Sequence, residues 1–305
     1  MELKNRKILL RYGENPNQNA YLISNINKSI FDYQISGKKI SYNNIIDLDS
    51  GLKCLSEFNE PTSIIIKHTN PCGVASSKNI LDAFQKSYES DSKSAFGGIV
   101  LLNRKVNSVL AKEIIKNFFE IVIAPAFEKT AIKILKSKKN LILIITPKLK
   151  TQNTNFRSTL FGDLYQTADL NPINKKFIKL ISNKKASSKS LDDLIFSLKV
   201  VKHLKSNAIV LSQNKQTVGL GHGQTNRVDS LHFAIKNKNI YFKDKSFVCA
   251  SDGFFPFSDS INLLDKNGCK VVGQPNGSIN DKKIVSFANK KNISLYFIKN
   301  RLFKH

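Results

Sequence analysis

The segment SIIIKHTNPCG, residues 63–73, joins an apolar run to residues that favour turns. The run predicts a buried strand over Ser63–Lys67, and the Asn, Pro and Gly after it predict a turn over Thr69–Gly73. Such a strand would hold Lys67 and His68 rigidly while the turn exposes them. A histidine can move a proton near neutral pH, and a neighbouring ammonium can stabilise a developing anion. The pair is therefore a candidate for chemistry, against the alternative that His68 is a satisfied structural histidine.

Strands and helices alternate along the whole sequence, which predicts an α/β fold. We expect two halves, residues 1–150 and 151–305, and interpret the polar, lysine-rich segment Thr146–Ser158 as the loop or linker between them. In the first half, the other expected strands are Gly98–Leu102, Ile121–Ala124 and Leu141–Ile145, and the expected helices are Ile80–Ser87 and Val106–Asn117.

The second half repeats this alternation, which is consistent with an old duplication. Ser190 is predicted to be the N-cap of a helix that runs to about Lys205, because apolar residues recur after it at helical spacing. Further strands are expected at Ala208–Ser212, Thr217–Leu220, Ser246–Ala250 and Lys270–Val272, and further helices at Val228–Lys236, Ser260–Lys266 and Asp281–Lys290.

The composition limits the class of protein. The chain has 305 residues, 41% of them hydrophobic, which is typical of a globular protein. A formal net charge of +25 raises nucleic-acid binding as an alternative, but the lysines are spread along the chain and form no known basic–aromatic motif. We therefore expect no nucleic-acid partner. No apolar run has the length of a membrane span or the place of a signal peptide, so we expect a cytoplasmic protein with no membrane partner.

The cysteine pattern predicts the absence of a metal site. Cys54, Cys72, Cys249 and Cys269 are far apart and lack the spacing of zinc ligands. We expect reduced, mostly buried thiols.

Other stretches combine polar groups with turn-forming residues. Arg11 and Tyr12 in LRYGENPNQ, residues 10–18, would suit a phosphate or carboxylate, although an ordinary surface loop is the alternative. The glycines that end SAFGG, residues 94–98, either make a turn or let backbone approach a ligand. The glycine-rich VGLGHGQ, residues 218–224, lacks the spacing of a nucleotide-binding loop, and Arg227 beyond it is a candidate anion contact.

The stretch SDGFFPFSD, residues 251–259, combines aromatic rings with the carboxylates of Asp252 and Asp259. One interpretation is a strand end with core phenylalanines. The other is a slot in which a flat heterocycle stacks while an acid binds its ring N–H groups.

In their order along the chain, these motifs resemble the AICAR formyltransferase part of the bifunctional purine-biosynthesis enzymes, AICAR being phosphoribosylaminoimidazolecarboxamide. The resemblance covers nearly the whole chain, from Leu10 to His305. The matching stretches are LRYGENPNQ, KISYNNIIDLD, IIKHTNPCGVA, SAFGGIVLLNR, VIAPAF, KSNAIV, GHGQTNRVDS, ASDGFFPFSDSI and the terminal RLFKH.

The resemblance implies two cytidine-deaminase-like, three-layer α/β/α subdomains, 1–150 and 151–305, in an intertwined homodimer with active sites at the subunit interface. The implied reaction belongs to de novo IMP biosynthesis and moves the formyl group of 10-formyltetrahydrofolate, a cosubstrate and no permanent cofactor, to the 5-amino group of AICAR. The products would be FAICAR and tetrahydrofolate. The missing zinc ligands oppose a deaminase-like hydrolase, and an inactive or non-catalytic basic nucleic-acid-binding relative is the other alternative.

The resemblance also implies roles for single residues. His68 would be the proton acceptor, Lys67 the stabiliser of the tetrahedral oxyanion, and Asn207 the residue that orients the reacting groups. The positions that match AICAR-binding residues are Arg11, Tyr12, Gly97, Glu120, Arg227, Phe254 and Arg301. The positions that match residues binding 10-formyltetrahydrofolate are Val228, Asp259, Ser278 and Ile279.

In the family, a cyclohydrolase domain precedes the RYG motif, and the resemblance implies that these 305 residues do not include it. We therefore expect formyl transfer without IMP cyclohydrolase activity, with a separate IMP cyclohydrolase as a further partner. The chain would be either a stand-alone enzyme or a fragment of a bifunctional one. His222 stands in the glycine-rich stretch where the family has a small residue.

Overall fold

The computed structural model describes residues 6–24, 29–146, 153–243 and 246–305. Its first half contains β1 (Arg6–Leu9), β2 (Tyr21–Ser24), the 3-10 helix η1 (Ile30–Tyr33), β3 (Gln34–Ser36), α1 (Tyr42–Leu55), β4 (Thr62–Lys67), β5 (Asn70–Ser76), α2 (Ile80–Ser90), α3 (Ser92–Ala95), β6 (Gly98–Leu102), α4 (Ser108–Ile114), β7 (Phe119–Ala124), α5 (Lys129–Leu135) and β8 (Ile142–Ile145). The second half contains β9 (Thr154–Thr159), β10 (Gly162–Thr167), the 3-10 helix η2 (Lys175–Phe177), β11 (Ile178–Leu180), α6 (Ser188–Val201), β12 (Ile209–Gln213), β13 (Gln216–Gly221), α7 (Arg227–Tyr241), β14 (Phe247–Ser251), α8 (Asp259–Lys266), β15 (Cys269–Pro275), α9 (Asp281–Lys290) and β16 (Ser294–Ile298).

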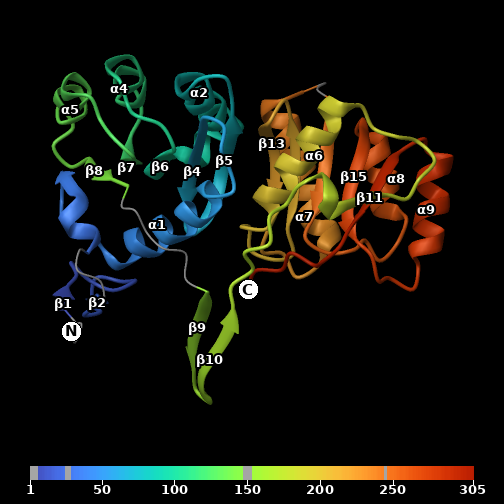
Figure 1. The fold of residues 1–305 in the computed structure, drawn as a ribbon, viewed down its shortest axis with the longest axis horizontal. Coiled ribbons are helices and arrows are strands. Elements are labelled where there is room, and N and C mark those ends of the chain that lie inside the picture. Colours follow the sequence, from blue (N-terminus) through green and yellow to red (C-terminus); the bar gives the residue numbers. More distant parts are fainter. Residues whose placement is uncertain (1–5, 25–28, 147–152, 244–245) are drawn as a thin grey trace.

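Twelve of the described strands form one mixed sheet, in which each half contributes the same pattern (Figure 1). Outward from the junction, the first half has the order β5-β4-β6-β7-β8-β3 and the second has β13-β12-β14-β15-β16-β11. Each half begins with an antiparallel hairpin, continues antiparallel to its third strand, adds two parallel strands, and closes with an antiparallel edge. The structure thus confirms the predicted α/β alternation and shows that it is a structural repeat.

The two halves meet along β5 and β13, so the sheet continues across the chain. Gln216 pairs with Ala75 in antiparallel register. The Val74 amide donates to Thr217 Oγ1 at 3.0 Å, and Gln216 Nε2 donates to the Lys86 carbonyl at 2.9 Å. Side chains therefore replace the ladder hydrogen bonds where the two edges diverge.

Helices cover both faces of the sheet. Alternate residues of β4 separate the two layers: Ile64 and Ile66 pack in the cluster with α1, and Ile65 packs in the cluster with α2, α4 and α5. Figure 1 shows α1 on the opposite side of the first half from these three helices. In the second half α6 extends the cluster of α1, and α7, α8 and α9 cover the other face. No helix in the described ranges is long and apolar enough to cross a membrane.

The structure confirms the predicted strands but shifts many of the predicted boundaries. For example, α4 is Ser108–Ile114 rather than Val106–Asn117, and α7 runs to Tyr241 rather than Lys236. Gly98–Leu102 and Asp281–Lys290 have the predicted bounds. The turn predicted over Thr69–Gly73 is wrong, because β5 begins at Asn70 and the turn is only two residues long. Ser190 is not the N-cap of α6: the Ser187 hydroxyl caps this helix by accepting from the Ser190 amide, and the helix ends at Val201, before Lys205.

The interpretation of Thr146–Ser158 as a linker is partly wrong. Residues 147–152 lie outside the described parts of the chain, but Thr154–Ser158 belongs to β9, which pairs with β10 as a separate hairpin. Figure 1 shows this hairpin extending away from both halves. Five of its large side chains are at least 63% exposed, namely Phe156, Leu160, Phe161, Leu164 and Tyr165. A two-stranded hairpin is at best marginally stable alone in water.

A glycine at the same strand position lets a helix lie directly on each hairpin. Gly73 is the fourth residue of β5, and Gly219 is the fourth residue of β13. A Cβ on Gly73 would lie 1.9 Å from the Ser87 carbonyl oxygen of α2, and one on Gly219 would lie 2.2 Å from the Ala234 carbonyl oxygen of α7. Both obstacles are helix backbone, which cannot move aside as a side chain can.

We predict that Gly73→Ala and Gly219→Ala each lower the free energy of unfolding, because the added methyl group forces the helix off the sheet. Overpacking of this kind costs about 1–3 kcal/mol or more. Gly223→Ala is the control: its Cβ would meet no atom within 4 Å, although its φ of 71° makes any side chain strained there. Thermal denaturation should rank both test variants below the control. A Gly73→Ala protein as stable as the wild type would contradict the close packing.

Candidate active site

Lys67 and His68 lie at the tip of the β4–β5 hairpin, as predicted. Lys67 pairs with Asn70, so His68 and Thr69 are the two central residues of the turn. Their φ values are 49° and 65°. Both central residues of a type I′ hairpin turn need positive φ, which is why Asn and Gly usually fill these positions. The turn leaves the His68 side chain exposed at the end of a buried strand.

The Lys67 ammonium points back to the loop before β6. Its Nζ donates to the Phe96 carbonyl at 2.5 Å. Gly97 follows with a φ of 69°, and a Cβ there would lie 3.1 Å from Lys67 Nζ. The glycine pair predicted from the sequence therefore both makes a turn and gives the lysine room beside the backbone.

Glu120 connects this region to Arg11. Its carboxylate accepts from Asn44 Nδ2 at 3.0 Å and from Lys38 Nζ at 3.2 Å. Burial alone would raise the pKa of Glu120, but the Asn44 hydrogen bond and the charges of Lys38 and Arg11 outweigh it and lower that pKa. Arg11 also donates to the Tyr12 hydroxyl at 2.8 Å, with its guanidinium 4.6 Å from the ring centroid. The first group of site residues, all from the first half, thus consists of Arg11, Tyr12, Glu120, Gly97, Lys67 and the adjacent His68.

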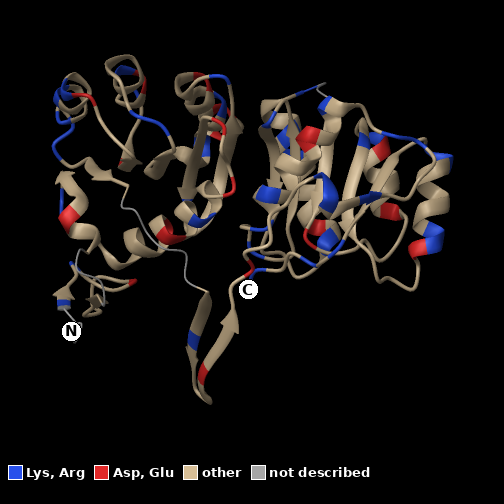
Figure 2. Cartoon of the chain, viewed as in Figure 1, with Lys and Arg blue, Asp and Glu red and all other residues tan. Residues whose placement is uncertain are grey.

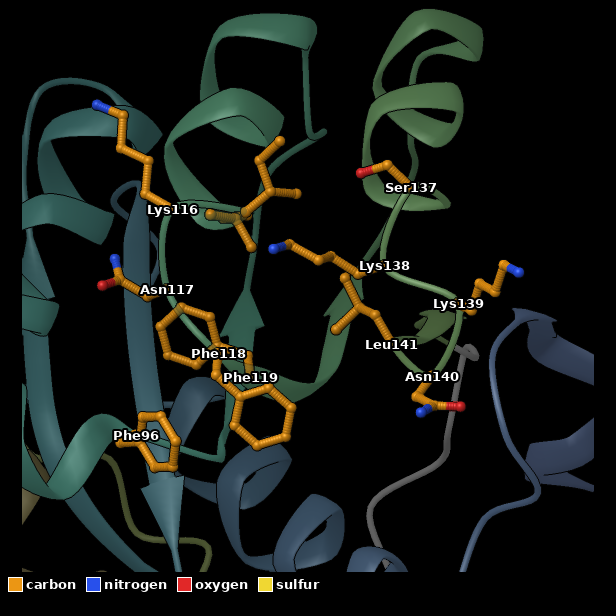
Figure 3. A pocket seen from close by; sticks show the side chains of 12 residues that line it. Phe96, Lys116, Asn117, Phe118, Phe119, Ser137, Lys138, Lys139, Asn140 and Leu141 are labelled. Atoms are coloured by element: carbon orange, nitrogen blue, oxygen red, sulfur yellow. The ribbon is translucent and has the colours of Figure 1, made fainter.

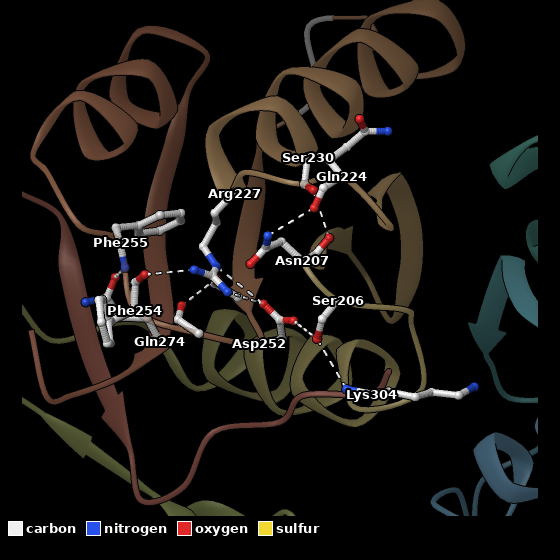
Figure 4. A network of polar contacts seen from close by, with 12 residues as sticks. Ser206, Asn207, Gln224, Arg227, Ser230, Asp252, Phe254, Phe255, Gln274 and Lys304 are labelled. Atoms are coloured by element: carbon white, nitrogen blue, oxygen red, sulfur yellow. Dashed lines mark hydrogen bonds and ion pairs between the residues drawn. The ribbon is translucent and has the colours of Figure 1, made fainter. Parts of the chain in front are cut away.

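A second group gathers around a buried ion pair in the second half (Figure 4). Arg227 Nη2 lies 3.0 Å from Asp252 Oδ1, and the two side chains are 11% and 0% exposed. Arg227 Nη1 also donates to the Phe254 carbonyl at 3.2 Å, and the Ser206 hydroxyl donates to Asp252 Oδ2 at 2.6 Å. Both carboxylate oxygens of Asp252 therefore already accept hydrogen bonds from the protein. Asp252 is not the acid that would bind a heterocycle in the predicted slot.

Asn207 and Arg301 border this ion pair. Asn207 Nδ2 donates to the carbonyls of Gln224 and Thr225 at 3.0 and 3.2 Å. These hydrogen bonds fix the Asn207 side chain to the backbone at the end of the glycine-rich stretch. Arg301 is exposed, and its guanidinium lies 5.3 Å from the Phe254 ring centroid and 5.7 Å from that of Phe303. Arg301 is thus a cation on an aromatic platform, in a geometry that favours cation–π attraction.

The four positions predicted to bind folate lie on adjoining segments of the second half. Val228 follows Arg227 in α7, and Asp259 begins α8. Ser278 and Ile279 precede α9 in a loop that Asn280 ties to the Pro256 carbonyl by a 2.8 Å hydrogen bond. The side chains of Phe257 and Ile279 are exposed beside this tie.

The hairpin turn and the Asn207 segment meet within one chain. The Lys205 amide donates to Asn70 Oδ1 at 3.0 Å, and Lys304 Nζ donates to Ser50 Oγ at 2.9 Å. In contrast, among the described residues no hydrogen bond or ion pair joins Arg11 and Glu120 to Arg227 and Arg301. The structure therefore brings the predicted site residues together as two groups with a contact at the hairpin turn.

Sequence reasoning missed several residues that hold these groups. Asp47 Oδ1 accepts from the Thr69 amide at 2.6 Å, and Ser50 Oγ donates to the Thr69 carbonyl at 2.5 Å. Lys304 hydrogen-bonds Ser50, and burial lowers the pKa of both Lys304 and the nearby His222. The stretch KISYNNIIDLD contains Asp47 and precedes Ser50, but its spacing alone does not show that these two residues, three apart on α1, face the hairpin turn.

A pocket of about 570 Å³ lies between the C-terminal ends of α4 and α5 (Figure 3). Phe96 and Phe118 line it with ring centroids 5.1 Å apart, and Lys116, Lys138 and Lys139 also border it. It contains none of the predicted site residues, although Phe96 precedes Gly97. The pocket is therefore a neighbour of the first group rather than its centre.

The cysteines do not contribute to either group. All four are free, and burial raises the pKa of the Cys72 and Cys269 thiols to about 12. Their thiolates are thus disfavoured at neutral pH. In the ranges that the structure describes, no group of three or more His, Cys, Asp or Glu residues is placed to hold a metal ion.

Fold and site together define a repeated α/β protein with a strand-end Lys-His pair and, in its second half, cationic and aromatic side chains. The model of the AICARFT/IMPCHase bienzyme family matches residues 1–237. This match covers more than half of the chain, and the chain belongs to that family.

Curated relatives support the same assignment. The chain is 46% identical over 304 residues to the bifunctional purine biosynthesis protein PurH of Caldicellulosiruptor bescii, a match that covers 97% of this chain and 59% of the relative. Proteins of the same name from Acetivibrio thermocellus and from Buchnera aphidicola subsp. Schizaphis graminum are 42% and 44% identical, again over 97% of this chain and 59% and 58% of theirs. The chain thus spans about 59% of the length of the relatives that it matches.

The buried pair predicts different roles for the two arginines. Arg227→Ala should leave the Asp252 carboxylate buried without its cation, which costs about 3–5 kcal/mol of unfolding free energy. Arg301→Ala, a change at an exposed cation beside the Phe254 and Phe303 rings, is the control and should cost about 0.5 kcal/mol or less. Urea denaturation measures both.

A double variant tests the cause. Asp252→Asn added to Arg227→Ala removes the unpaired charge and should recover part of the lost stability. Equal stability of Arg227→Ala and Arg301→Ala would contradict the buried-pair account.

Proposed function

We propose that this chain is an AICAR formyltransferase, which transfers the formyl group of 10-formyltetrahydrofolate to the 5-amino group of AICAR and yields FAICAR and tetrahydrofolate. The observation that carries the proposal is the hairpin tip, where an exposed imidazole stands next to an ammonium that donates to the Phe96 carbonyl beside Gly97. Membership of the family and the names of the curated relatives support it.

The reaction needs the chemistry that this pair offers. The AICAR amine is a poor nucleophile because its lone pair delocalises into the ring and the carboxamide. In the proposed mechanism its nitrogen attacks the formyl carbon, Lys67 stabilises the tetrahedral oxyanion, and His68 accepts the amine proton. The bond from the formyl carbon to folate N10 then breaks, and N10 takes a proton that the same imidazolium can return. Asn207 orients the reacting groups, a positioning effect that suits its fixed amide.

The binding roles follow the two groups. We assign AICAR to Arg11, Tyr12, Gly97, Glu120, Arg227, Phe254 and Arg301, and 10-formyltetrahydrofolate to Val228, Asp259, Ser278 and Ile279. Exposed Arg301 is suited to bind the ribose phosphate directly. Arg227, whose guanidinium already serves Asp252, fits better as the support that fixes the Phe254 backbone. Exposed Phe257 and Ile279 offer apolar contact to a flat folate ring.

We further propose that each half is a cytidine-deaminase-like α/β/α subdomain, 1–150 and 151–305, working without the deaminase metal. The support is the shared strand order with helices on both faces. The enzyme is proposed to be cytoplasmic and to bind no nucleic acid. Figure 2 is consistent with the latter, since Lys and Arg are spread over both halves rather than gathered in one stripe. Ring closure to IMP is assigned to a cyclohydrolase unit outside these 305 residues.

We also propose a homodimer whose sites combine the first group of one chain with the second group of its partner. Two observations support it. The groups lack a direct hydrogen bond or ion pair to one another within the described residues, and the β9–β10 hairpin exposes large apolar side chains that a second copy would cover. A two-fold dimer would then hold two equivalent sites.

We predict that His68→Ala and Lys67→Ala each reduce turnover by about a hundredfold or more, since each removes a proton acceptor or an oxyanion partner. The assay is tetrahydrofolate release from purified protein supplied with AICAR and 10-formyltetrahydrofolate. His232→Ala and Lys112→Ala, at exposed residues outside both groups, are the matched controls and should retain activity. Near-normal turnover in both test variants would refute the assignment.

A mixing experiment tests the composite site. His68→Ala and Arg301→Ala disable different groups, so a heterodimer of the two should hold one intact site. With random exchange about half of the dimers are heterodimers, and activity should recover to roughly a quarter of the wild-type value. No recovery after verified subunit exchange would show that each site is built within one chain, along the contact of Asn70 with Lys205.

A further inference from the structure

The structural repeat supplies an internal comparison for the catalytic turn. The hairpins β4–β5 and β12–β13 have turns of the same length, since Lys67 pairs with Asn70 and Gln213 with Gln216. The central residues have the same backbone: φ is 49° and 65° at His68 and Thr69, and 53° and 54° at Asn214 and Lys215. The second turn, which has no histidine, therefore shows which contacts stabilise this backbone conformation in the absence of a catalytic role.

Each turn is held by a carboxylate at the same helix position. Asp47 is the sixth residue of the 14-residue α1, and Asp193 is the sixth residue of the 14-residue α6. Asp47 Oδ1 accepts from the Thr69 amide at 2.6 Å. Asp193 accepts from the amides of Asn214 and Lys215 at 2.9 and 2.7 Å. In both hairpins, a carboxylate from the preceding helix thus accepts hydrogen bonds from the backbone amides of the turn.

The first turn needs this support more than the second. Asn tolerates the left-handed region comparatively well, whereas a β-branched residue such as Thr69 is an outlier there. A residue held in such a sparsely populated region is strained. The first turn also has a second tie: Ser50 Oγ donates to the Thr69 carbonyl and accepts from Lys304 Nζ. The residue at the same helix position in α6 is Phe196, which has no polar group to offer.

The strained residue is next to the imidazole. Thr69 follows His68 directly, so fixing the Thr69 peptide fixes the backbone from which the imidazole projects. Strain of this kind persists where the surroundings over-determine it, and it clusters at functional sites. Asp47 itself is half-buried in a charged setting. Burial raises its pKa, with the Thr69 hydrogen bond and the charges of His68 and Lys67 acting in the opposite direction.

We propose that Asp47 is a positioning residue for His68: through the Thr69 amide it holds the left-handed turn that sets the imidazole against the AICAR amine. This inference rests on the proposed formyltransferase function. Asp47 touches neither substrate in the proposal and acts only through the turn.

The test is a series of variants assayed for kcat and KM with both substrates. Asp47→Ala removes the acceptor and should lower kcat by about a hundredfold, because a misplacement of about 1 Å costs that much. KM should change by about threefold or less, as expected when an interaction matters only in the transition state. Asp47→Asn retains an oxygen that can accept from the Thr69 amide and should recover most of the loss.

Two further variants separate positioning from general damage. Asp193→Ala removes the matching cap in the second half and should leave kcat within about threefold of the wild type at a temperature where the protein is folded. Thr69→Gly accommodates positive φ, so it should restore part of kcat in the Asp47→Ala background. Equal kcat losses in Asp47→Ala and Asp193→Ala, or wild-type kcat in Asp47→Ala, would overturn the proposal.

Hydrogen exchange of the Thr69 amide tests the role of Asp47 in the turn independently of enzymatic activity. The amide should be protected in the wild type and in Asp47→Asn, and it should exchange at least tenfold faster in Asp47→Ala. If the wild type releases no tetrahydrofolate, the proposed function fails and the exchange rates alone decide whether Asp47 holds the turn. Unchanged protection in Asp47→Ala would overturn it in either case.

Discussion

The two-residue turn between β4 and β5 is the constraint on which the candidate site depends. The turn has the type I′ form, in which both central residues have positive φ. The sequence places His68 and Thr69 at these positions, and neither residue type favours positive φ. Contacts from the surrounding structure must therefore stabilise this backbone conformation. Asp47 and Ser50 on α1 make these contacts and hold the N–H and C=O of Thr69. The rigid sheet behind the turn and the helix beside it therefore fix one exposed imidazole.

The repeat shows how one architecture serves two purposes. Both halves use a glycine to seat a helix on the hairpin and a helix carboxylate to close its turn. The first half then adds the Lys-His pair, and the second adds the buried Arg227–Asp252 pair and the aromatic platform under Arg301. Desolvating Arg227 costs energy that only its pairing offsets, whereas Arg301 remains free to meet an anion from solution. Each arginine is thus suited to a different task, although we propose that both contribute to the AICAR site.

The sequence predicted the elements that have a regular apolar pattern. Gly98–Leu102 is apolar at every position but its glycine, and its bounds are correct because a strand buried on both faces needs such a run. Polar elements were missed. The helix α1 contains Asn43, Asn44 and Gly51, which weaken its helical pattern, and β5 begins with Asn70 and Pro71, which usually mark turns. Tertiary contacts override these local preferences. The roles of Asp47, Asp252 and Lys304 depend on segments far apart in the chain, so no local pattern could reveal them.

The central claim is that the chain moves a formyl group from folate to the AICAR amine. The most direct measurement follows a ¹³C-labelled formyl carbon from 10-formyltetrahydrofolate in the presence of purified protein, with AICAR present or omitted. We expect the label on the 5-amino nitrogen of AICAR, one tetrahydrofolate released for each label transferred, and no release when AICAR is omitted. Release of labelled formate independent of AICAR, or no transfer at all by the folded protein, would contradict the account.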